Sequence, residues 1–125
     1  MILLHSQGGN FAFNSALKYP DKVKAIVAVR TSGCPTRTKQ IFQKSKAYPC
    51  CGYGGNNLGK HPFWAGITAH QDKFRENLAQ AGGVADKLLL PEAGVIGNSH
   101  MMMDQNSDQV AGLIQQWLTK QGVMK

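Results

Sequence analysis

The chain has 125 residues, of which 42% are hydrophobic and 17% are charged. This length suits one domain with a hydrophobic core, and the composition excludes a highly charged disordered tail. No apolar run approaches the roughly 20 residues that a membrane-spanning helix needs, so no membrane span is expected. We predict a single domain over residues 1–125.

The predicted elements alternate between apolar strands and amphipathic helices. In chain order they are a strand at 2–4, a helix at 10–18, strands at 23–29 and 48–53, a helix at 64–81, a strand at 87–90 and a helix at 107–120. This order is typical of a parallel sheet that is covered on both faces. The predicted fold class is α/β, with about four mostly parallel strands and helices on both faces.

The net charge of +7 makes the chain basic, because 14 Lys and Arg outnumber 7 Asp and Glu. Such an excess attracts polyanions without selecting among them. The densest basic stretch lacks the interleaved aromatic residues of single-strand binders and is interpreted as solvated surface. Its cations are Arg37, Lys39, Lys44 and Lys46. Nucleic-acid binding is therefore a minor hypothesis.

The cysteines and histidines show no metal-ligand spacing. Cys34, Cys50 and Cys51 cannot all pair within one chain, and the adjacent pair is interpreted as buried packing in a strand. The glycines form no phosphate-binding motif. We predict no metal and no cofactor, and the cellular compartment is not indicated.

A serine stands between the first apolar strand and the first helix, in the segment His5-Ser6-Gln7-Gly8. A serine on a tight strand-to-helix turn projects its hydroxyl above the sheet edge, as in a nucleophile elbow. The usual pattern is G-x-S-x-G, and here Leu4 occupies the first position, where a side chain is expected to crowd the turn.

A histidine follows the last predicted strand, in the segment Gly97-Asn98-Ser99-His100. Imidazole titrates near neutral pH, which suits it to take a proton from a serine hydroxyl. Ser6 and His100 are therefore the candidate nucleophile and base. For His5 and His70 the favoured interpretation is packing or hydrogen bonding, and Phe63 and Trp64 are considered either as pocket wall or as core.

The chain resembles the C-terminal half of bacterial and fungal serine esterases of the α/β-hydrolase fold. The resemblance lies in the segments 5–9, 20–27 and 94–103, together with Asn106 and residues 110–117. The chain is most similar to esterases that read G-H-S-Q-[SG]-G around the serine and L-P-x-x-G-[IV]-x-G-N-[ST]-H-M around the histidine. This resemblance implies hydrolysis of a small-molecule acyl ester, with Ser6 as nucleophile, His100 as base and the backbone N–H of Gln7 as half of the oxyanion hole.

The same resemblance locates two slots for the acid that orients the histidine, and neither holds a carboxylate here. One slot, in a segment like A-I-V-x-V-E-P, is occupied by Arg30, and the commoner slot by Gly55. Glu92 and Asp104 are near His100 in sequence but lie in no motif, and Asn56 or Asn57 could orient the imidazole without charge. We therefore expect weak activity at best.

The chain begins inside the strand that leads to Ser6, whereas a complete α/β-hydrolase places several strands before it. We expect assembly into a homo-oligomer through the exposed edge of this strand, or a chain that is a fragment of a larger polypeptide. The leading hypothesis is a carboxylesterase-like domain. The alternative is a non-catalytic module that keeps the architecture and serves binding or assembly.

Overall fold

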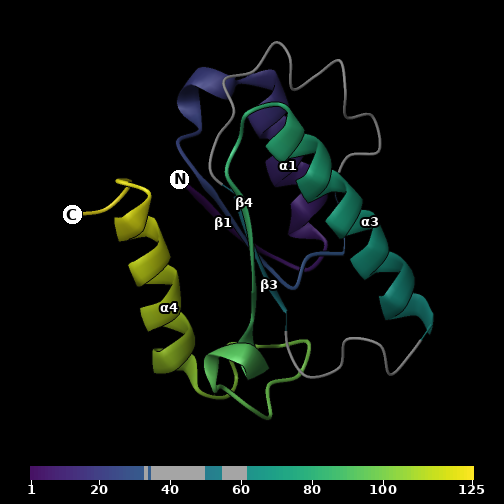
Figure 1. The fold of residues 1–125 in the computed structure, drawn as a ribbon, viewed down its shortest axis with the longest axis vertical. Helices are drawn as coiled ribbons and strands as arrows, with labels where there is room; N and C mark the ends of the chain where they lie inside the picture. Colours follow the sequence, from purple (N-terminus) through teal and green to yellow (C-terminus); the bar gives the residue numbers. More distant parts are fainter. Residues whose placement is uncertain (33, 35–49, 55–61) are drawn as a thin grey trace.

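The computed structural model describes residues 1–32, 34, 50–54 and 62–125, and Figure 1 shows their arrangement. The elements are β1 (Ile2–His5), α1 (Gly8–Lys18), the 3-10 helix η1 (Pro20–Lys22), β2 (Ile26–Val29), β3 (Cys50–Gly54), α3 (Pro62–Gln80), β4 (Ala85–Leu89), the 3-10 helix η2 (Leu90–Ala93) and α4 (Ser107–Lys120). The predicted α/β class is confirmed.

The described strands form one parallel sheet in the order β1-β2-β3-β4. Its register aligns Ile2 with Ile26, Ile26 with Cys50, and Cys50 with Ala85. All four residues of β2 are buried, because helices cover this strand on both faces. The strand therefore has no solvent-facing side and its sequence does not alternate between apolar and polar residues. β1 lies at one edge of the described sheet.

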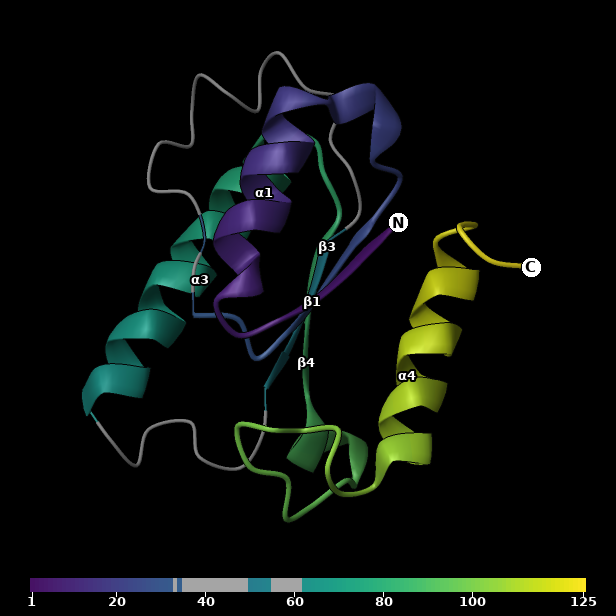
Figure 2. The same cartoon turned by 180° about the vertical axis from the view of Figure 1, so that it is seen from behind.

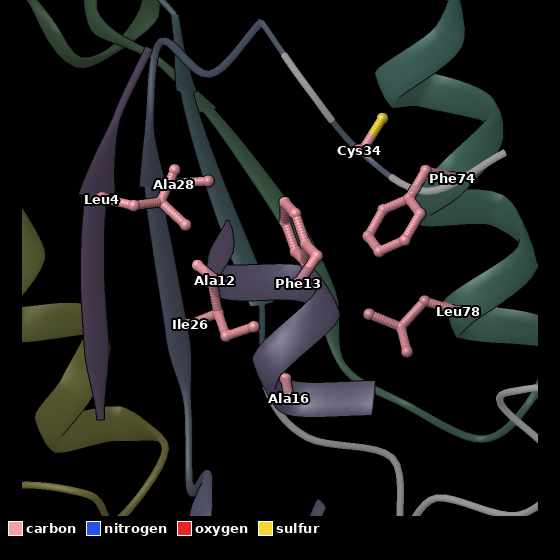
Figure 3. Packing of buried hydrophobic residues seen from close by; sticks show 9 residues of the cluster. All are labelled: Leu4, Ala12, Phe13, Ala16, Ile26, Ala28, Cys34, Phe74 and Leu78. Carbon is pink, nitrogen blue, oxygen red and sulfur yellow. The ribbon is translucent and has the colours of Figure 1, made fainter. Parts of the chain in front are cut away.

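Helices α1 and α3 lie on one face of the sheet and α4 lies on the other (Figures 1 and 2). On the α1–α3 side, Phe13 and Phe74 meet with ring centroids 4.8 Å apart, above Ile26 of the sheet (Figure 3). On the opposite side a second cluster joins the sheet to α4, and its buried members are Ala25, Val27, Val29, Leu90, Val95, Met102, Val110, Trp117 and Leu118. Successive residues of β2 thus supply alternate layers of the core.

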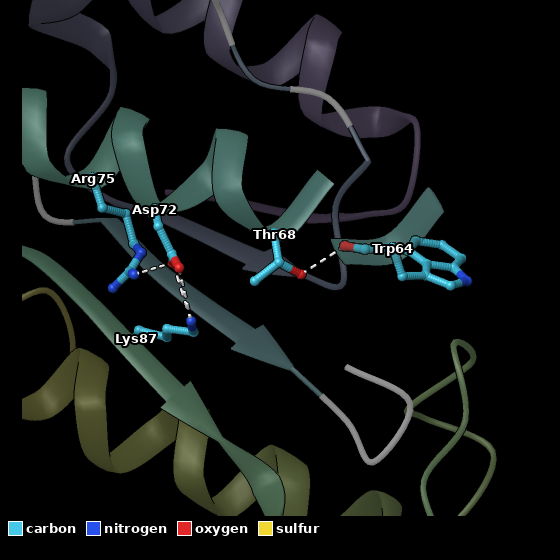
Figure 4. Close-up of polar contacts among 5 residues, drawn as sticks. All are labelled: Trp64, Thr68, Asp72, Arg75 and Lys87. Carbon is cyan, nitrogen blue, oxygen red and sulfur yellow. Dashed lines mark hydrogen bonds and ion pairs between the residues drawn. The ribbon is translucent and has the colours of Figure 1, made fainter. Parts of the chain in front are cut away.

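An ion-pair group ties α3 to β4 (Figure 4). Asp72 accepts hydrogen bonds from Arg75 on its own helix and from Lys87 Nζ at 3.0 Å. Burial raises the pKa of Asp72, but hydrogen bonds and attraction from Lys87 and Arg75 outweigh it, so that the pKa is lowered. On the first turns of α3, Thr68 Oγ1 donates to the carbonyl of Trp64 at 2.9 Å.

Several predicted bounds were wrong by a few residues. Helix α1 begins at Gly8 rather than residue 10, because the turn after Ser6 leads directly into the helix. Strand β2 begins at residue 26 rather than 23, because the preceding residues close the η1 turn, with Val23 N–H donating to the Pro20 carbonyl. Helix α3 begins at Pro62, a residue suited to a first helical turn. Strands β3 and β4 also differ from their predicted ranges, whereas α4 agrees with its range.

Within the described ranges, no helix is both long enough and apolar enough to cross a membrane.

Candidate active site

Parallel strands end at the same edge of a sheet, and three candidate residues meet at this edge. Ser6 directly follows β1, Arg30 directly follows β2, and His100 lies in the loop between η2 and α4. Open parallel sheets bind ligands at the carboxyl ends of their strands, so this edge is where a reactive site is expected.

The backbone at Ser6 is left-handed, with φ of 52°. Such a conformation costs energy in a residue with a side chain and persists only where neighbours hold it. Here Ser6 N–H donates to the Val29 carbonyl at 3.3 Å, and the Ser6 carbonyl accepts from Ser32 N–H at 3.1 Å and from Thr31 Oγ1 at 2.9 Å. The segment after β2 therefore holds the turn that presents the Ser6 hydroxyl.

Leu4 does not prevent this turn, contrary to the expectation that its side chain would crowd it. The Leu4 side chain is buried in the α1–α3 cluster, as Figure 3 shows. Helix α1 approaches it at Gly8, where a Cβ would lie 3.7 Å from Leu4 Cβ, an ordinary contact distance. The turn accommodates Leu4 because that side chain points into the core.

The loop that carries His100 is held by Asn98, which is 2% exposed. Its Nδ2 donates to the carbonyls of Met102 at 2.7 Å and Gln105 at 2.6 Å, and its Oδ1 accepts from Asn106 Nδ2 at 3.0 Å. Sequence reasoning quoted Asn98 within a motif but assigned it no role. These bonds identify it as the residue that organises the histidine loop.

Ser6 and His100 are in hydrogen-bond contact, with 3.0 Å between Ser6 Oγ and His100 Nε2. His5 Nε2 donates to the His100 carbonyl at 3.0 Å, and the rings of these two histidines lie 4.8 Å apart. The Trp64 ring lies 4.9 Å from the His100 ring on another side. The His100 ring is thus positioned by the hydrogen bond that His5 donates to the His100 carbonyl and by the ring of Trp64 on α3.

The pKa of His100 is lowered from its usual value. Burial is the largest cause, because it disfavours the charged form, and the charges of His5 and Arg30 add to it. His100 Nδ1 is buried and has no hydrogen-bond partner within the described ranges. Glu92 and Asp104, both considered as acids, are exposed and do not bond to it.

Arg30 occupies the slot where the resemblance located the acid. Its backbone is left-handed, with φ of 47°, and its side chain is 5% exposed. The guanidinium carbon lies 4.5 Å from the centroid of the Trp64 ring, in a cation–π arrangement. Burial lowers the pKa of Arg30, and its Nε and Nη2 have no hydrogen-bond partner in the described part of the chain. The second slot, Gly55, and the alternatives Asn56 and Asn57 lie outside the described residues.

Gln7 follows Ser6 and is the N-cap of α1. Its carbonyl accepts from Asn10 N–H at 3.3 Å, within the first turn of the helix. N–H groups at a helix N-terminus have no partner within the helix, and the local dipole favours negative charge there. The Gln7 N–H therefore belongs to a turn that suits an oxyanion next to Ser6.

Other residues singled out from the sequence have structural roles or lie outside the described ranges. His70 Nε2 donates to the Cys34 carbonyl at 3.1 Å, which agrees with a hydrogen-bonded packing role. Cys34 is buried, and burial raises the pKa of its thiol to about 11. The basic stretch at 37–46 lies outside the described residues. The described side chains include no group that could hold a metal ion.

Comparison with known proteins relates the chain to an esterase by structure. The chain is similar to a solved structure reported as that of a novel bacterial esterase, with a TM-score of 0.84 and 35% sequence identity. The similarity covers 95% of this chain and 37% of that protein, so the chain spans little more than a third of the esterase's length. No protein-family model matches the chain, and no curated protein matches it. The structural similarity supports an esterase-like fold.

Proposed function

We propose that the chain carries a serine-dependent carboxylesterase site of the α/β-hydrolase type, acting on small-molecule acyl esters with low turnover. The observation that carries this proposal is the 3.0 Å contact between Ser6 Oγ and His100 Nε2 on a left-handed turn after a parallel strand. The similarity to a bacterial esterase over 95% of the chain supports ester hydrolysis as the type of reaction.

In the proposed reaction, Ser6 Oγ attacks the ester carbonyl carbon while His100 Nε2 takes the hydroxyl proton. The Gln7 N–H donates a hydrogen bond to the resulting oxyanion. The imidazolium then gives its proton to the leaving alkoxide, and the acyl group remains on Ser6. Water, activated by the same imidazole, hydrolyses the acyl-enzyme and restores Ser6.

Low turnover follows from the surroundings of His100 Nδ1. A histidine that accepts the serine proton at Nε2 must carry its own proton at Nδ1, where it is buried without a partner within the described ranges. Either tautomer leaves this buried nitrogen without a partner, as a donor or as an acceptor, at a cost of about 1–3 kcal/mol. No contact in the described part of the chain therefore holds the imidazole in the tautomer that can accept the Ser6 proton. The nearby charge of Arg30 also disfavours the imidazolium intermediate.

A fluorophosphonate probe tests the nucleophile directly, because it reacts with activated serines. We expect the wild-type chain to be labelled, Ser6→Ala to abolish labelling, and His100→Ala to slow it by about 100-fold or more. Ser15→Ala, which changes an exposed serine on α1, is the matched control and keeps full labelling. Absence of labelling in a chain whose circular dichroism is that of the folded protein would refute the proposal.

That negative result would support the second candidate function, a non-catalytic module. The observation in its favour is that the described residues bring no carboxylate to His100 Nδ1. Assembly through β1 stays a prediction, and the half-exposed Leu3 on this strand (57%) is the residue it depends on.

A further inference from the structure

Three buried polar atoms at the sheet edge that carries Ser6 and His100 have no hydrogen-bond partner among the described residues: Arg30 Nε, Arg30 Nη2 and His100 Nδ1. Buried polar groups are nearly always paired, and an exception in a native structure calls for an explanation such as a catalytic role or a bound water or ion. The reaction proposed above leaves all three unused. They also share a neighbour, because both Arg30 and His100 lie against the Trp64 ring.

The two unpaired atoms of Arg30 define the shape of what could bind. Nε and Nη2 lie on the same edge of the planar guanidinium, so their N–H bonds run parallel. This edge matches the two oxygens of a carboxylate, which accepts both bonds in a bidentate pair. Trp64 covers the face of the guanidinium, with 4.5 Å from its ring centroid to Cζ, and hydrogen bonding is therefore confined to the edges.

His100 Nδ1 requires the same kind of ligand. In the tautomer needed for catalysis this atom carries a proton and donates, and a carboxylate is the acceptor that stabilises it best. Arg30 Cζ lies 4.5 Å and the His100 ring centroid 4.9 Å from the centroid of the same Trp64 ring, so the two groups belong to one cluster. An anion held by Arg30 would offset the charge of the guanidinium and accept from Nδ1.

We propose that Arg30 and His100 Nδ1 form a binding site for a small carboxylate, which serves the imidazole as the triad acid. The catalytic consequence rests on the proposed function, whereas the binding does not. The carboxylate accepts hydrogen bonds and stays ionised, while the Ser6 proton moves to His100 Nε2 and then to the leaving group. Either a free ion such as formate or a carboxylate carried by the ester substrate would supply this chemistry.

Binding is measured first, by thermal unfolding in increasing sodium formate with NaCl adjusted to constant ionic strength. We expect the midpoint to rise saturably, by about 4 °C, in the wild type and in Ser6→Ala. Arg30→Gln removes the shift, and Arg30→Lys weakens it because ammonium lacks the two-donor edge. Arg75→Gln, which changes an arginine paired with Asp72 on α3, is the matched control and keeps the shift. Formamide, which has the shape of formate without its charge, has no effect.

Activity is measured second, with p-nitrophenyl acetate as a neutral ester and p-nitrophenyl hemisuccinate as an anionic one. We expect formate to raise kcat for the neutral ester about tenfold or more, as a partial return of the roughly ten-thousandfold effect of a triad acid. Loss of this activation in Arg30→Gln assigns the site to the free ion. A preference for the hemisuccinate that Arg30→Gln abolishes assigns the carboxylate to the substrate.

The outcomes separate the two proposals. A midpoint shift that depends on Arg30, in a chain that the fluorophosphonate does not label, supports the carboxylate site and refutes the esterase. Labelling at Ser6 without any midpoint shift or activation refutes the carboxylate site and leaves the esterase standing. A midpoint shift that persists in Arg30→Gln also overturns the site, because formate would then bind elsewhere.

Discussion

Replacing Arg30 with glutamate should raise the esterase activity that we propose for the Ser6–His100 pair. The substitution removes a buried cation whose charge opposes imidazolium formation, and it introduces a carboxylate at the end of β2 that can accept from His100 Nδ1. The left-handed backbone at this position already carries a side chain with a Cβ, so the change adds no backbone strain.

Two effects set the size of the expected rise in kcat: pairing of the buried Nδ1 and stabilisation of the imidazolium. Pairing the buried Nδ1 donor recovers about 1–3 kcal/mol, which corresponds to a rate factor of about 5 to 160. Stabilising the imidazolium moves the total toward the roughly ten-thousandfold that a triad acid contributes. We therefore expect kcat for p-nitrophenyl acetate to rise about 100-fold or more in Arg30→Glu.

The assay compares kcat and KM for the wild type, Arg30→Glu and Arg30→Gln, with His100→Ala added to the Arg30→Glu background. The increase for Arg30→Glu should appear in kcat. Arg30→Gln should give a smaller increase in kcat, because an amide carries no charge. The increase should disappear when His100→Ala is added to Arg30→Glu. Formate should no longer activate Arg30→Glu, since the side chain supplies the carboxylate. A folded Arg30→Glu protein with unchanged kcat would show that Arg30 does not occupy the acid position.

Three further predictions concern pH, the core and the buried thiol. The lowered pKa of His100 places the acid limb of the kcat/KM profile below the ordinary histidine value of about 6.5. Arg30→Gln removes a positive charge and should therefore move that limb to higher pH. An acid limb that stays in place would contradict the effect of the Arg30 charge on His100. Leu78→Ala opens a cavity in the α1–α3 cluster and should lower the free energy of unfolding by about 3 kcal/mol in urea, whereas Gln80→Ala on the exposed face should change it by less than about 0.5 kcal/mol. Cys34, with its pKa raised to about 11, should resist iodoacetamide at pH 8 in the folded chain and react in urea, as followed by peptide mass spectrometry; equal rates in both states would mean that the thiol is accessible.

Local patterns were sufficient to predict much of the fold. The apolar register of the last helix located α4 at its observed bounds, because one buried stripe and a polar remainder specify both a helix and its face. The continuous apolar run of β2 likewise indicated a strand covered on both sides. The starts of α1 and β2 were wrong because turn hydrogen bonds, rather than hydrophobicity, decide where these elements begin.

The candidate site was predictable in part. Ser6 and His100 could be singled out because each lies in a short segment between recognisable elements, and a parallel sheet brings the ends of its strands to one edge. The role of Asn98 was missed because its partners are backbone carbonyls, which no residue pattern records. The bond from His5 to the His100 carbonyl spans 95 positions and was equally invisible.

The sequence by itself determined which side chains are available for chemistry: a serine at a turn, a histidine in a late loop, and an arginine in the slot where the resemblance led us to expect an acid. Only the tertiary structure decided that this arginine is buried against Trp64 with one edge unpaired, beside an imidazole that lacks an acceptor within the described ranges. The physical reason is that burial and hydrogen bonding depend on distances between segments far apart in the chain. Those distances are set by sheet register and helix packing, which a linear pattern does not contain.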